Sequence, residues 1–286
     1  MGKAVAVLGL GIMGHGIADN FLKGGYSVVV WNRTPEKAKD LVQKGAKLAG
    51  SVSEAVQDAD IIFEVTANDE SSKSVWLGEG GIIENAKPEQ YLVSCATISA
   101  AWADELAAQC TEKGLTFFDI PMTGGRVAAE SGQLTLLAGG SKEKLDEITA
   151  DLQAIAKEVK YFGKVGSGMR YKLILNGLQA IHIAGLGEAL RIAKEAGLDL
   201  KLVGDALAER PGGVITNITW NSYQKEPEQT TFSVEWTDKD LGYAAQLAGT
   251  TAHPLITEVK KQYDSAIEQG YAQADWTKIN RLYMQQ

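Results

Sequence analysis

Three short segments of the sequence hold residues whose types and spacing could carry chemistry. The first runs from Asp119 to Gly125, where the hydroxyl of Thr123 precedes the adjacent backbone amides of Gly124 and Gly125. Adjacent amides of this kind form a small nest that suits an anion such as a carboxylate. Taken alone, the segment is more typical of a simple turn.

The second segment runs from Gly166 to Asn176 and carries Lys172. Lys172 and Asn176 are four residues apart on a predicted helix, so their side chains share one face. That face otherwise has apolar neighbours such as Met169 and Ile183. From these residues alone two interpretations stay open: a lysine that is used in the site, or one whose amine reaches out to solvent.

The third segment, Thr237 to Leu241, opens a later helix and contains Lys239. Charges at the start of a helix normally form a solvated cap. Trp220, Trp236 and Tyr243 could line a pocket near this segment, but aromatic residues at helical spacing more often belong to a core.

A dinucleotide site is predicted at the beginning of the chain. An apolar run over 4–8 enters Gly9-Leu10-Gly11-Ile12-Met13-Gly14, and a helix and a second apolar run over 27–31 follow. In such a turn Gly9 permits the tight bend, Gly11 lets the backbone approach a diphosphate, and Gly14 lets the helix pack on the sheet. The helix N-terminus offers free N–H groups to the phosphates.

The residues after the second run indicate which dinucleotide is bound. An NAD site usually has Asp or Glu about 20 residues after the glycines, whereas this sequence has Asn32, Arg33 and Thr34. A guanidinium can pair with a 2′-phosphate and a hydroxyl can donate to it, while a carboxylate would repel it. We therefore expect NADP(H). Arg33 could also be an ordinary solvated charge, and Thr34 with Pro35 could simply begin the next helix.

Composition narrows the class of protein. The 286 residues carry a net charge of −8, with 45% hydrophobic and 22% charged residues, which is typical of a globular protein and disfavours a nucleic-acid surface. The two cysteines, Cys95 and Cys110, suggest neither a disulfide framework nor a metal site. We expect a reducing, cytoplasmic location, no metal, and no apolar run near the roughly 18 residues of a membrane span.

The positions of the apolar runs predict an α/β fold followed by an all-α domain. The predicted strands span 4–8, 27–31, 60–65, 91–95, 116–119, 134–138 and 158–161, as a Rossmann-type doubly wound parallel sheet. The predicted helices of this part span 13–24, 35–44, 52–57, 71–76, 99–113 and 141–156. After residue 166 the strand pattern ends, and helices are predicted at 169–196, 199–208, 213–223, 236–249, 253–268 and 275–284. The expected domains are 1–162 and 163–286, joined by the long helix.

Together the segments resemble the β-hydroxyacid dehydrogenase family, which includes 3-hydroxyisobutyrate dehydrogenases, tartronate semialdehyde reductases and glyoxylate/succinic semialdehyde reductases. The resemblance covers essentially the whole chain. The family's cofactor motif matches Gly9 to Gly14, and its substrate motif matches Asp119 to Gly125, with Thr123 where the family usually has Ser. Its catalytic motif, G-x-G-x-x-x-K-x-x-x-N, matches 166–176, and its late Lys-Asp-Leu matches 239–241.

The resemblance implies roles for the matching residues. Lys172 would be the general acid/base, and burial beside the cofactor would lower the pKa of a lysine toward neutrality. Asn176 would hold the substrate or Lys172, and Thr123, Gly124 and Gly125 would bind the substrate carboxylate. The extra methyl group of Thr123 leaves the size of the substrate open.

The remaining implied contacts concern the cofactor. Thr97 would lie near the nicotinamide, Val65 and Thr66 would line its ribose, and Lys239 would close over the cofactor or the substrate. The full expected cofactor set is Gly9, Gly11, Ile12, Met13, Gly14, Asn32, Arg33, Thr34, Val65, Thr66, Thr97 and Lys239.

The sequence thus favours an NADPH-dependent reductase of a small aldehyde or keto acid, such as glyoxylate or succinic semialdehyde. The alternatives are an imine reductase, a 3-hydroxyisobutyrate or tartronate semialdehyde dehydrogenase, and a non-catalytic NADP-binding module. The expected partners are a small carboxylated substrate and further copies of the chain, as a homodimer or homotetramer, with no nucleic acid and no membrane. Gly177, Gly185 and Gly187 on the long helix would permit close helix contact.

Overall fold

A computed structural model describes residues 3–57, 59–209, 214–248, 250 and 252–283. The chain forms two compact units, Met1–Lys172 and Leu173–Gln286. The sequence places its domain boundary ten residues earlier, after 162. The structural division lies inside the long helix because the first turn of that helix is bonded to the first unit.

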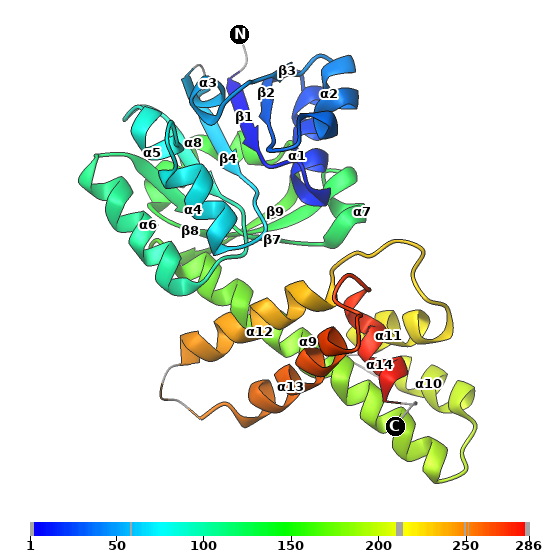
Figure 1. Ribbon diagram of the computed structural model, residues 1–286. Helices are drawn as coiled ribbons and strands as arrows, with labels where there is room; N and C mark the ends of the chain where they lie inside the picture. Colours follow the sequence, from blue (N-terminus) through cyan, green and yellow to red (C-terminus); the bar gives the residue numbers. More distant parts are fainter. Residues whose placement is uncertain (1–2, 58, 210–213, 249, 251, 284–286) are drawn as a thin grey trace. The chain divides into compact units, whose positions relative to one another are not determined.

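The first unit is built on a twisted sheet (Figure 1), whose described strands are β1 Ala4–Leu8, β2 Ser27–Trp31, β3 Lys47–Leu48, β4 Ile61–Glu64, β5 Tyr91–Ser94, β6 Thr116–Asp119, β7 Met122–Thr123, β8 Leu134–Gly139 and β9 Ala156–Gly163. The strand order is β3-β2-β1-β4-β5-β6-β8-β7, and β9 pairs with β8. Strands β1 to β6 pair in parallel. Their carboxyl ends therefore share one edge, where a ligand is expected.

Helices cover both faces of this sheet (Figure 1): α1 Ile12–Lys23, the 3-10 helix η1 Pro35–Ala38, α2 Lys39–Gln43, α3 Val52–Gln57, α4 Asp69–Leu77, α5 Ile82–Asn85, α6 Ala100–Glu112, α7 Gly125–Glu130 and α8 Lys142–Leu152. Alternate strand residues supply each face. On one face, Val5 and Val7 of β1 pack with Phe21 of α1 and Leu152 of α8. This two-sided burial explains why the strands are continuous apolar runs.

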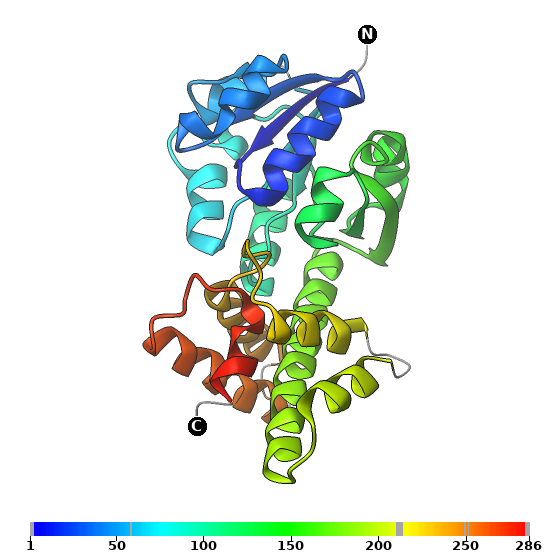
Figure 2. The ribbon, with the colours of Figure 1, turned by 90° about the vertical axis from the view of Figure 1, so that its right-hand side faces the viewer.

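The second unit is helical. It contains most of α9 Ser167–Glu195, with α10 Leu200–Ala208, α11 Val214–Gln224, α12 Val234–Ala248, α13 Pro254–Glu268, the 3-10 helix η2 Trp276–Lys278 and α14 Ile279–Leu282. Helix α9 runs through this unit (Figure 2). Its middle packs on α12 and α13 through Ile183, Leu241 and Tyr263, and its later turns pack on Trp220 of α11 through Leu186 and Leu190.

The predicted fold class, a Rossmann-type sheet followed by helices, is confirmed. One part of the sheet differs from the prediction: β8 runs antiparallel to β6 and β7, because β7 continues in the direction of β6 and the chain reverses only after it, through Gly124 and α7. The short elements β3, β7, α5 and α7 were not predicted. The predicted helix start at 213 and helix ends at 249 and 284 lie outside the described residues.

The expectation about membrane-spanning length was wrong for one segment. By length and composition, α9 could cross a membrane, and among the described helices it is the one that meets this criterion. Half of its most apolar stretch is buried inside the protein. A long core helix has the same composition, so this is weak evidence for a membrane location.

Both cysteines lie inside the first unit and are buried. Burial raises the pKa of the Cys110 thiol to about 12. Burial, together with the nearby Glu64 carboxyl, also raises the pKa of Cys95 far above its usual range. Neither thiol is therefore ionised near neutral pH.

Candidate active site

The glycine turn is shaped to receive a diphosphate. Helix α1 begins without a side-chain cap and without an acidic residue in its first turn. A Cβ atom on Gly14 would lie 1.9 Å from the carbonyl oxygen of Gly9, so packing requires a glycine there. A Cβ atom on Gly11 would meet nothing within 4 Å. The backbone at Gly11 is therefore open to a ligand, and the uncapped start of α1 leaves N–H groups for a phosphate, so the turn fits a dinucleotide.

The three residues that follow β2 divide into one that is bonded within the protein and two that face outward. The Oδ1 atom of Asn32 accepts a hydrogen bond from the Leu10 amide at 2.9 Å, and its Nδ2 atom donates to the carbonyl oxygen of Thr34 at 2.9 Å. Asn32 thus fixes the glycine turn against the end of β2. Thr34 takes the N-cap position of η1, but its hydroxyl makes no capping bond.

Arg33 is exposed. In the described part of the chain no carboxylate lies within ion-pair distance of its guanidinium. Arg33 and the hydroxyl of Thr34 are therefore able to bind a phosphate group.

The end of β4 contains a residue that the sequence analysis missed, Glu64. Its side chain is fully buried. The Oε1 atom accepts hydrogen bonds from the amide and the hydroxyl of Thr66, and Oε2 accepts one from the Ser94 hydroxyl at 2.8 Å. Burial raises the pKa of this carboxyl, and the three donors only partly offset that effect. Glu64 thus holds Thr66, which with Val65 is half-buried just beyond the strand.

A charged residue that ends the apolar run Ile61-Ile62-Phe63 was the signal for Glu64 in the sequence. The next strand, β5, ends at Ser94, and Thr97 lies half-buried in the loop that follows. Val65, Thr66 and Thr97 therefore all follow the carboxyl ends of neighbouring parallel strands.

The predicted substrate loop combines β7 with a sharp turn. Thr123 is the last residue of β7, and the φ angles of Gly124 and Gly125 are 126° and 67°. At Gly124 a side chain would be strained and would also lie 2.6 Å from the Cβ atom of Ala128. Helix α7 begins at Gly125, and Asn20 of α1 donates to the Ala129 carbonyl oxygen at 2.7 Å. The loop is thereby joined to the helix that follows the glycine turn.

The start of α9 is docked on the ends of β6 and β8. The Asp119 carboxylate is fully buried and accepts hydrogen bonds from the amides of Gly166 and Met169, both at 2.7 Å. A Cβ atom on Gly168 would lie 2.1 Å from the Leu137 carbonyl oxygen and 2.7 Å from that of Asp119. The glycine is needed because the helix backbone touches the strand ends directly.

Lys172 and Asn176 follow along α9, one helical turn apart. Both side chains are buried, with exposed fractions of 9% and 4%. The Asn176 amide donates to Oδ2 of Asp240 at 2.6 Å, and Lys239 forms an ion pair with the other carboxylate oxygen of Asp240 at 2.7 Å. Asp240, which the sequence analysis named only as part of a motif, therefore links Asn176 of α9 to Lys239 of α12.

The aromatic candidates have different environments. Trp220 is buried against Tyr223, and its indole donates to Asp205 at 2.8 Å, so it belongs to the core of α10 and α11. The amine of Lys239 lies 5.0 Å from the ring centre of Tyr243. Trp236 packs beside Phe232, with ring centres 5.8 Å apart.

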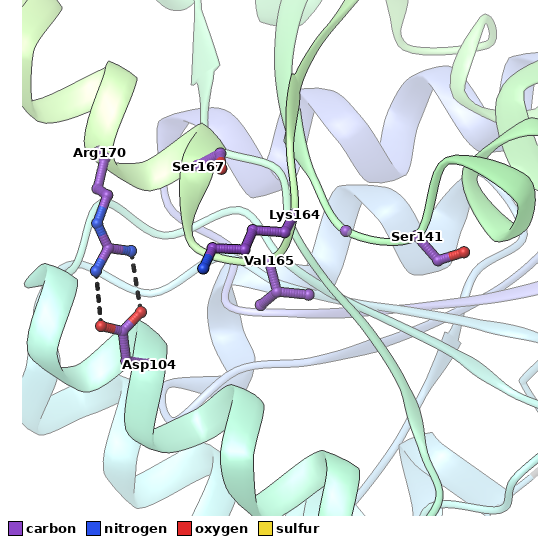
Figure 3. Close-up of a pocket in the computed structure, with 7 residues that line it drawn as sticks. Asp104, Ser141, Lys164, Val165, Ser167 and Arg170 are labelled. Atoms are coloured by element: carbon purple, nitrogen blue, oxygen red, sulfur yellow. Dashed lines mark hydrogen bonds and ion pairs between the residues drawn. The ribbon is translucent and has the colours of Figure 1, made fainter.

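A cavity of about 590 Å³ lies beside the first turn of α9 and is separate from these residues (Figure 3). Figure 3 shows Arg170 paired with Asp104 on one side of it, Ser141 on the other, and Lys164 and Val165 between them. Arg170 and Lys172 are two residues apart on the helix, so they point to nearly opposite sides. Thr123 and Lys172 are not among the lining residues.

Within the described residues, no three His, Cys, Asp or Glu side chains gather as a metal site. What the described residues do contain is a glycine turn at the end of β1, polar side chains after β4 and β5, and a buried lysine near the start of a long helix. This combination defines a nicotinamide-dependent oxidoreductase.

Comparison with known proteins identifies the family. Residues 4–163 match the model described as the NAD binding domain of 6-phosphogluconate dehydrogenase. Residues 166–283 match the one described as the NAD-binding domain of NADP-dependent 3-hydroxyisobutyrate dehydrogenase. The chain belongs to the β-hydroxyacid dehydrogenase family, and it is an NAD(P)-dependent oxidoreductase that acts on a hydroxyl donor.

Relatives of similar length support this assignment. An uncharacterized oxidoreductase of Synechocystis sp. is 32% identical over 265 residues, which cover 91% of each chain. The NAD-dependent L-serine dehydrogenase of Pseudomonas aeruginosa is 28% identical and matches over 98% of each chain.

Solved structures agree. The 3-hydroxyisobutyrate dehydrogenase of Salmonella typhimurium has a TM-score of 0.87 at 28% identity, with 98% of this chain and 99% of that chain covered. Psf3, solved with NADP+ and 2-OPP, has a TM-score of 0.88 at 25% identity, with 97% and 99% covered. An imine reductase variant from Myxococcus stipitatus, at 21% identity and a TM-score of 0.69 with 99% and 100% covered, shares the fold.

Proposed function

We propose that the protein reduces a small aldehyde or keto acid to the hydroxy acid with NADPH, with glyoxylate and succinic semialdehyde as the leading substrates. The observation that carries this proposal is the buried lysine, Lys172, one turn before Asn176 on α9. A buried lysine is costly to a fold unless it is used. NADPH, when bound, supplies the hydride.

The residues of this chain do the remaining work. Thr123 and the amides of Gly124 and Gly125 bind the carboxylate of the substrate and so orient its carbonyl group. Lys172 donates a proton to the carbonyl oxygen during reduction and takes it back during oxidation. Asn176 and Lys239, both bonded to Asp240, hold the substrate or the cofactor in place.

The test is turnover of NADPH with glyoxylate or succinic semialdehyde, followed at the nicotinamide absorbance. Lys172→Ala should lower kcat by about 10²–10⁴-fold, because it removes the general acid, and it should leave NADPH binding intact. Lys113→Ala, an exposed lysine at the end of α6, is the control and should retain activity. Wild-type turnover by Lys172→Ala would disprove the mechanism.

We also propose that the cofactor is NADP(H) rather than NAD(H), on the basis of the outward-facing Arg33 and Thr34. Arg33→Ala should weaken NADPH binding by about 10-fold or more, since it removes a charged partner of the 2′-phosphate. NADH binding, measured by the same fluorescence titration, should be unchanged. Equal losses for both cofactors would show that Arg33 does not recognise the phosphate.

A second candidate is oxidation of a small hydroxy acid, such as 3-hydroxyisobutyrate or the hydroxy acid that forms when tartronate semialdehyde is reduced. The names of the Pseudomonas and Salmonella proteins favour it. A substrate panel in both directions, run with NADPH and NADH, separates the two. Faster reduction of a cyclic imine than of any carboxylated aldehyde would instead favour an imine reductase, and cofactor binding without any turnover would favour a non-catalytic module.

The remaining proposals concern assembly and location. We propose a homodimer or homotetramer, supported by an apolar stripe on α9 formed by Ile174, Leu178 and Ile192, whose exposed fractions are 60%, 50% and 63%. We propose a cytoplasmic location, in keeping with two free thiols, Cys95 and Cys110.

A further inference from the structure

We propose that Asp119 is a positioning residue for Lys172: its carboxylate holds the first turn of α9, and thereby fixes where the lysine lies relative to the substrate loop. The proposal deepens the proposed function and rests on it for the role of Lys172. The hydrogen bonds of Asp119 can be tested without measuring enzyme activity.

The geometry places Asp119 between the two parts of the site within the first unit. It is the last residue of β6, directly before the segment that leads through β7 to Thr123 and Gly124. Its two carboxylate oxygens accept separate hydrogen bonds, Oδ1 from Gly166 and Oδ2 from Met169. One rigid side chain therefore joins the strand that carries the substrate loop to the helix that carries the lysine.

The two donors depend on this carboxylate. Met169 lies in the first turn of α9, where backbone amides have no carbonyl partner within the helix. Gly166, at a φ angle of 87°, precedes the helix. Lys172 follows Met169 by three residues, within the same rigid turn of helix. A displacement of the Met169 amide therefore moves Lys172 with it.

The contacts also make the position dependent on pH. Burial raises the pKa of the Asp119 carboxyl to about 6, although the bonds from Met169 and Gly166 and the charge of Arg170 act in the opposite direction. On the neighbouring strands, Ser94 of β5 and Gly139 of β8 bring no charge. When the carboxyl is protonated, one oxygen becomes a donor, so one of the two amides loses its acceptor.

Asp119→Asn tests the inference because it keeps the shape of the side chain but replaces one acceptor with a donor. Hydrogen exchange at pH 7.5 should be about 10-fold faster at the amides of Gly166 and Met169 than in the wild type. With glyoxylate or succinic semialdehyde, kcat should fall about 10-fold or more, while NADPH affinity stays within about 2-fold. The wild type should lose kcat below about pH 6, and this acid limb of the pH profile should be absent from the variant.

Asp104→Asn is the matched control. It makes the same change in a carboxylate that touches the same turn through Arg170, but at an exposed ion pair, where little stability is at stake. It should leave the exchange of Gly166 and Met169 and the acid limb of kcat unchanged.

Three outcomes decide the question. Wild-type exchange rates in Asp119→Asn, or an acid limb that persists in it, would overturn the inference. If Asp119→Asn does not fold, hydrogen exchange in the wild type is measured at pH 5 and pH 7.5 and corrected for intrinsic rates. If the amides of Gly166 and Met169 are protected equally well at the two pH values, the inference is overturned. If no substrate is turned over, the proposed function fails, and the exchange data still decide whether Asp119 holds the helix.

Discussion

Among the described residues of the first unit, two carboxylates are fully buried, and each lies at the carboxyl end of a parallel strand. Glu64 ends β4 and Asp119 ends β6. Each accepts bonds from the loop or helix that begins just beyond the sheet, Thr66 in one case and Gly166 with Met169 in the other. Burial of a charge is unfavourable. At these two positions the buried carboxylate holds the backbone that lies next to the expected site.

Glu64→Gln should reveal, as a function of pH, how much burial of the Glu64 charge lowers the free energy of unfolding. Because burial raises the folded-state pKa of Glu64 above its ordinary value of 4.5, the wild type loses stability as pH rises through that folded-state pKa, whereas the uncharged glutamine does not. The free energy of unfolding of Glu64→Gln relative to wild type should therefore increase by about 1 kcal/mol or more from pH 5 to pH 8.

Urea denaturation at the two pH values measures this difference. Glu143→Gln, at an exposed position in the first turn of α8, is the control and should show no such change. A constant difference for Glu64→Gln would mean that the folded-state pKa of Glu64 is not raised above its ordinary value, because its donors fully offset its burial.

The residue-level site was predictable where the signal is local in sequence. The glycine turn and the spacing of Lys172 and Asn176 are visible within a dozen residues. The bonds of Asp119 join positions 47 and 50 residues apart, and that of Glu64 to Ser94 spans 30 residues. A motif could place Asp119 near the site, but only the assembled sheet shows that its side chain faces α9.

At the scale of elements, α9 is the helix that carries the candidate residues Lys172 and Asn176. Its first turn is bonded to the strand ends of the first unit, and its later turns form the core of the helical unit. The glycines of the catalytic motif are explained by this docking, since the backbone at Gly168 contacts the carbonyl oxygens of Leu137 and Asp119. The motif thus encodes the position of the helix as well as the lysine to which we assign the proton transfer.

Gly168→Ala should separate the helix from the strand ends. The added methyl group meets backbone atoms, which cannot rotate away, so we expect a loss of about 1–3 kcal/mol in the free energy of unfolding. Gly242→Ala within α12 is the control, because a Cβ atom there would meet its nearest neighbour, Cε of Lys260, at an ordinary contact distance of 3.6 Å. That change should instead stabilise the helix by about 0.5–1 kcal/mol. Thermal or urea unfolding compares the two, and equal effects would argue against the docking.

Most elements with a clear apolar pattern were predicted, and the short elements without one were missed. The central strands and the long helices have a clear apolar period of two or 3.6 residues, or a continuous apolar run. The elements that were missed are two to six residues long: β3, β7, α5 and α7. A period cannot be recognised over so few residues. The direction of β8 was missed for a related reason, because it depends on the reversal through Gly124 and the short helix α7, between β7 and β8.

At the scale of the whole molecule, the proposed self-association rests on the exposed apolar stripe on α9 formed by Ile174, Leu178 and Ile192. Leu178 lies in its middle and is half exposed. Leu178→Glu would place a charge in an interface formed by this stripe, so the variant should sediment or elute as a smaller species than the wild type.

Light scattering coupled to size exclusion gives the mass of each species. Leu77→Glu makes the same substitution at an exposed leucine at the end of α4 in the first unit, and it should leave the mass unchanged. An unchanged mass for Leu178→Glu, at protein concentrations in the micromolar range, would show that the stripe is not the interface.

The two buried cysteines have a practical consequence for experiments on this chain. Cys95 and Cys110 are its whole complement of thiols, both are enclosed in the first unit, and burial keeps both protonated at neutral pH. Maleimides and other thiol reagents, which attack thiolates, should therefore find no target on the native wild-type protein. A single cysteine introduced at the surface of each unit would be labelled selectively without first removing the native ones. Fluorophore or spin-label pairs could then report the distance between the two units as cofactor and substrate bind.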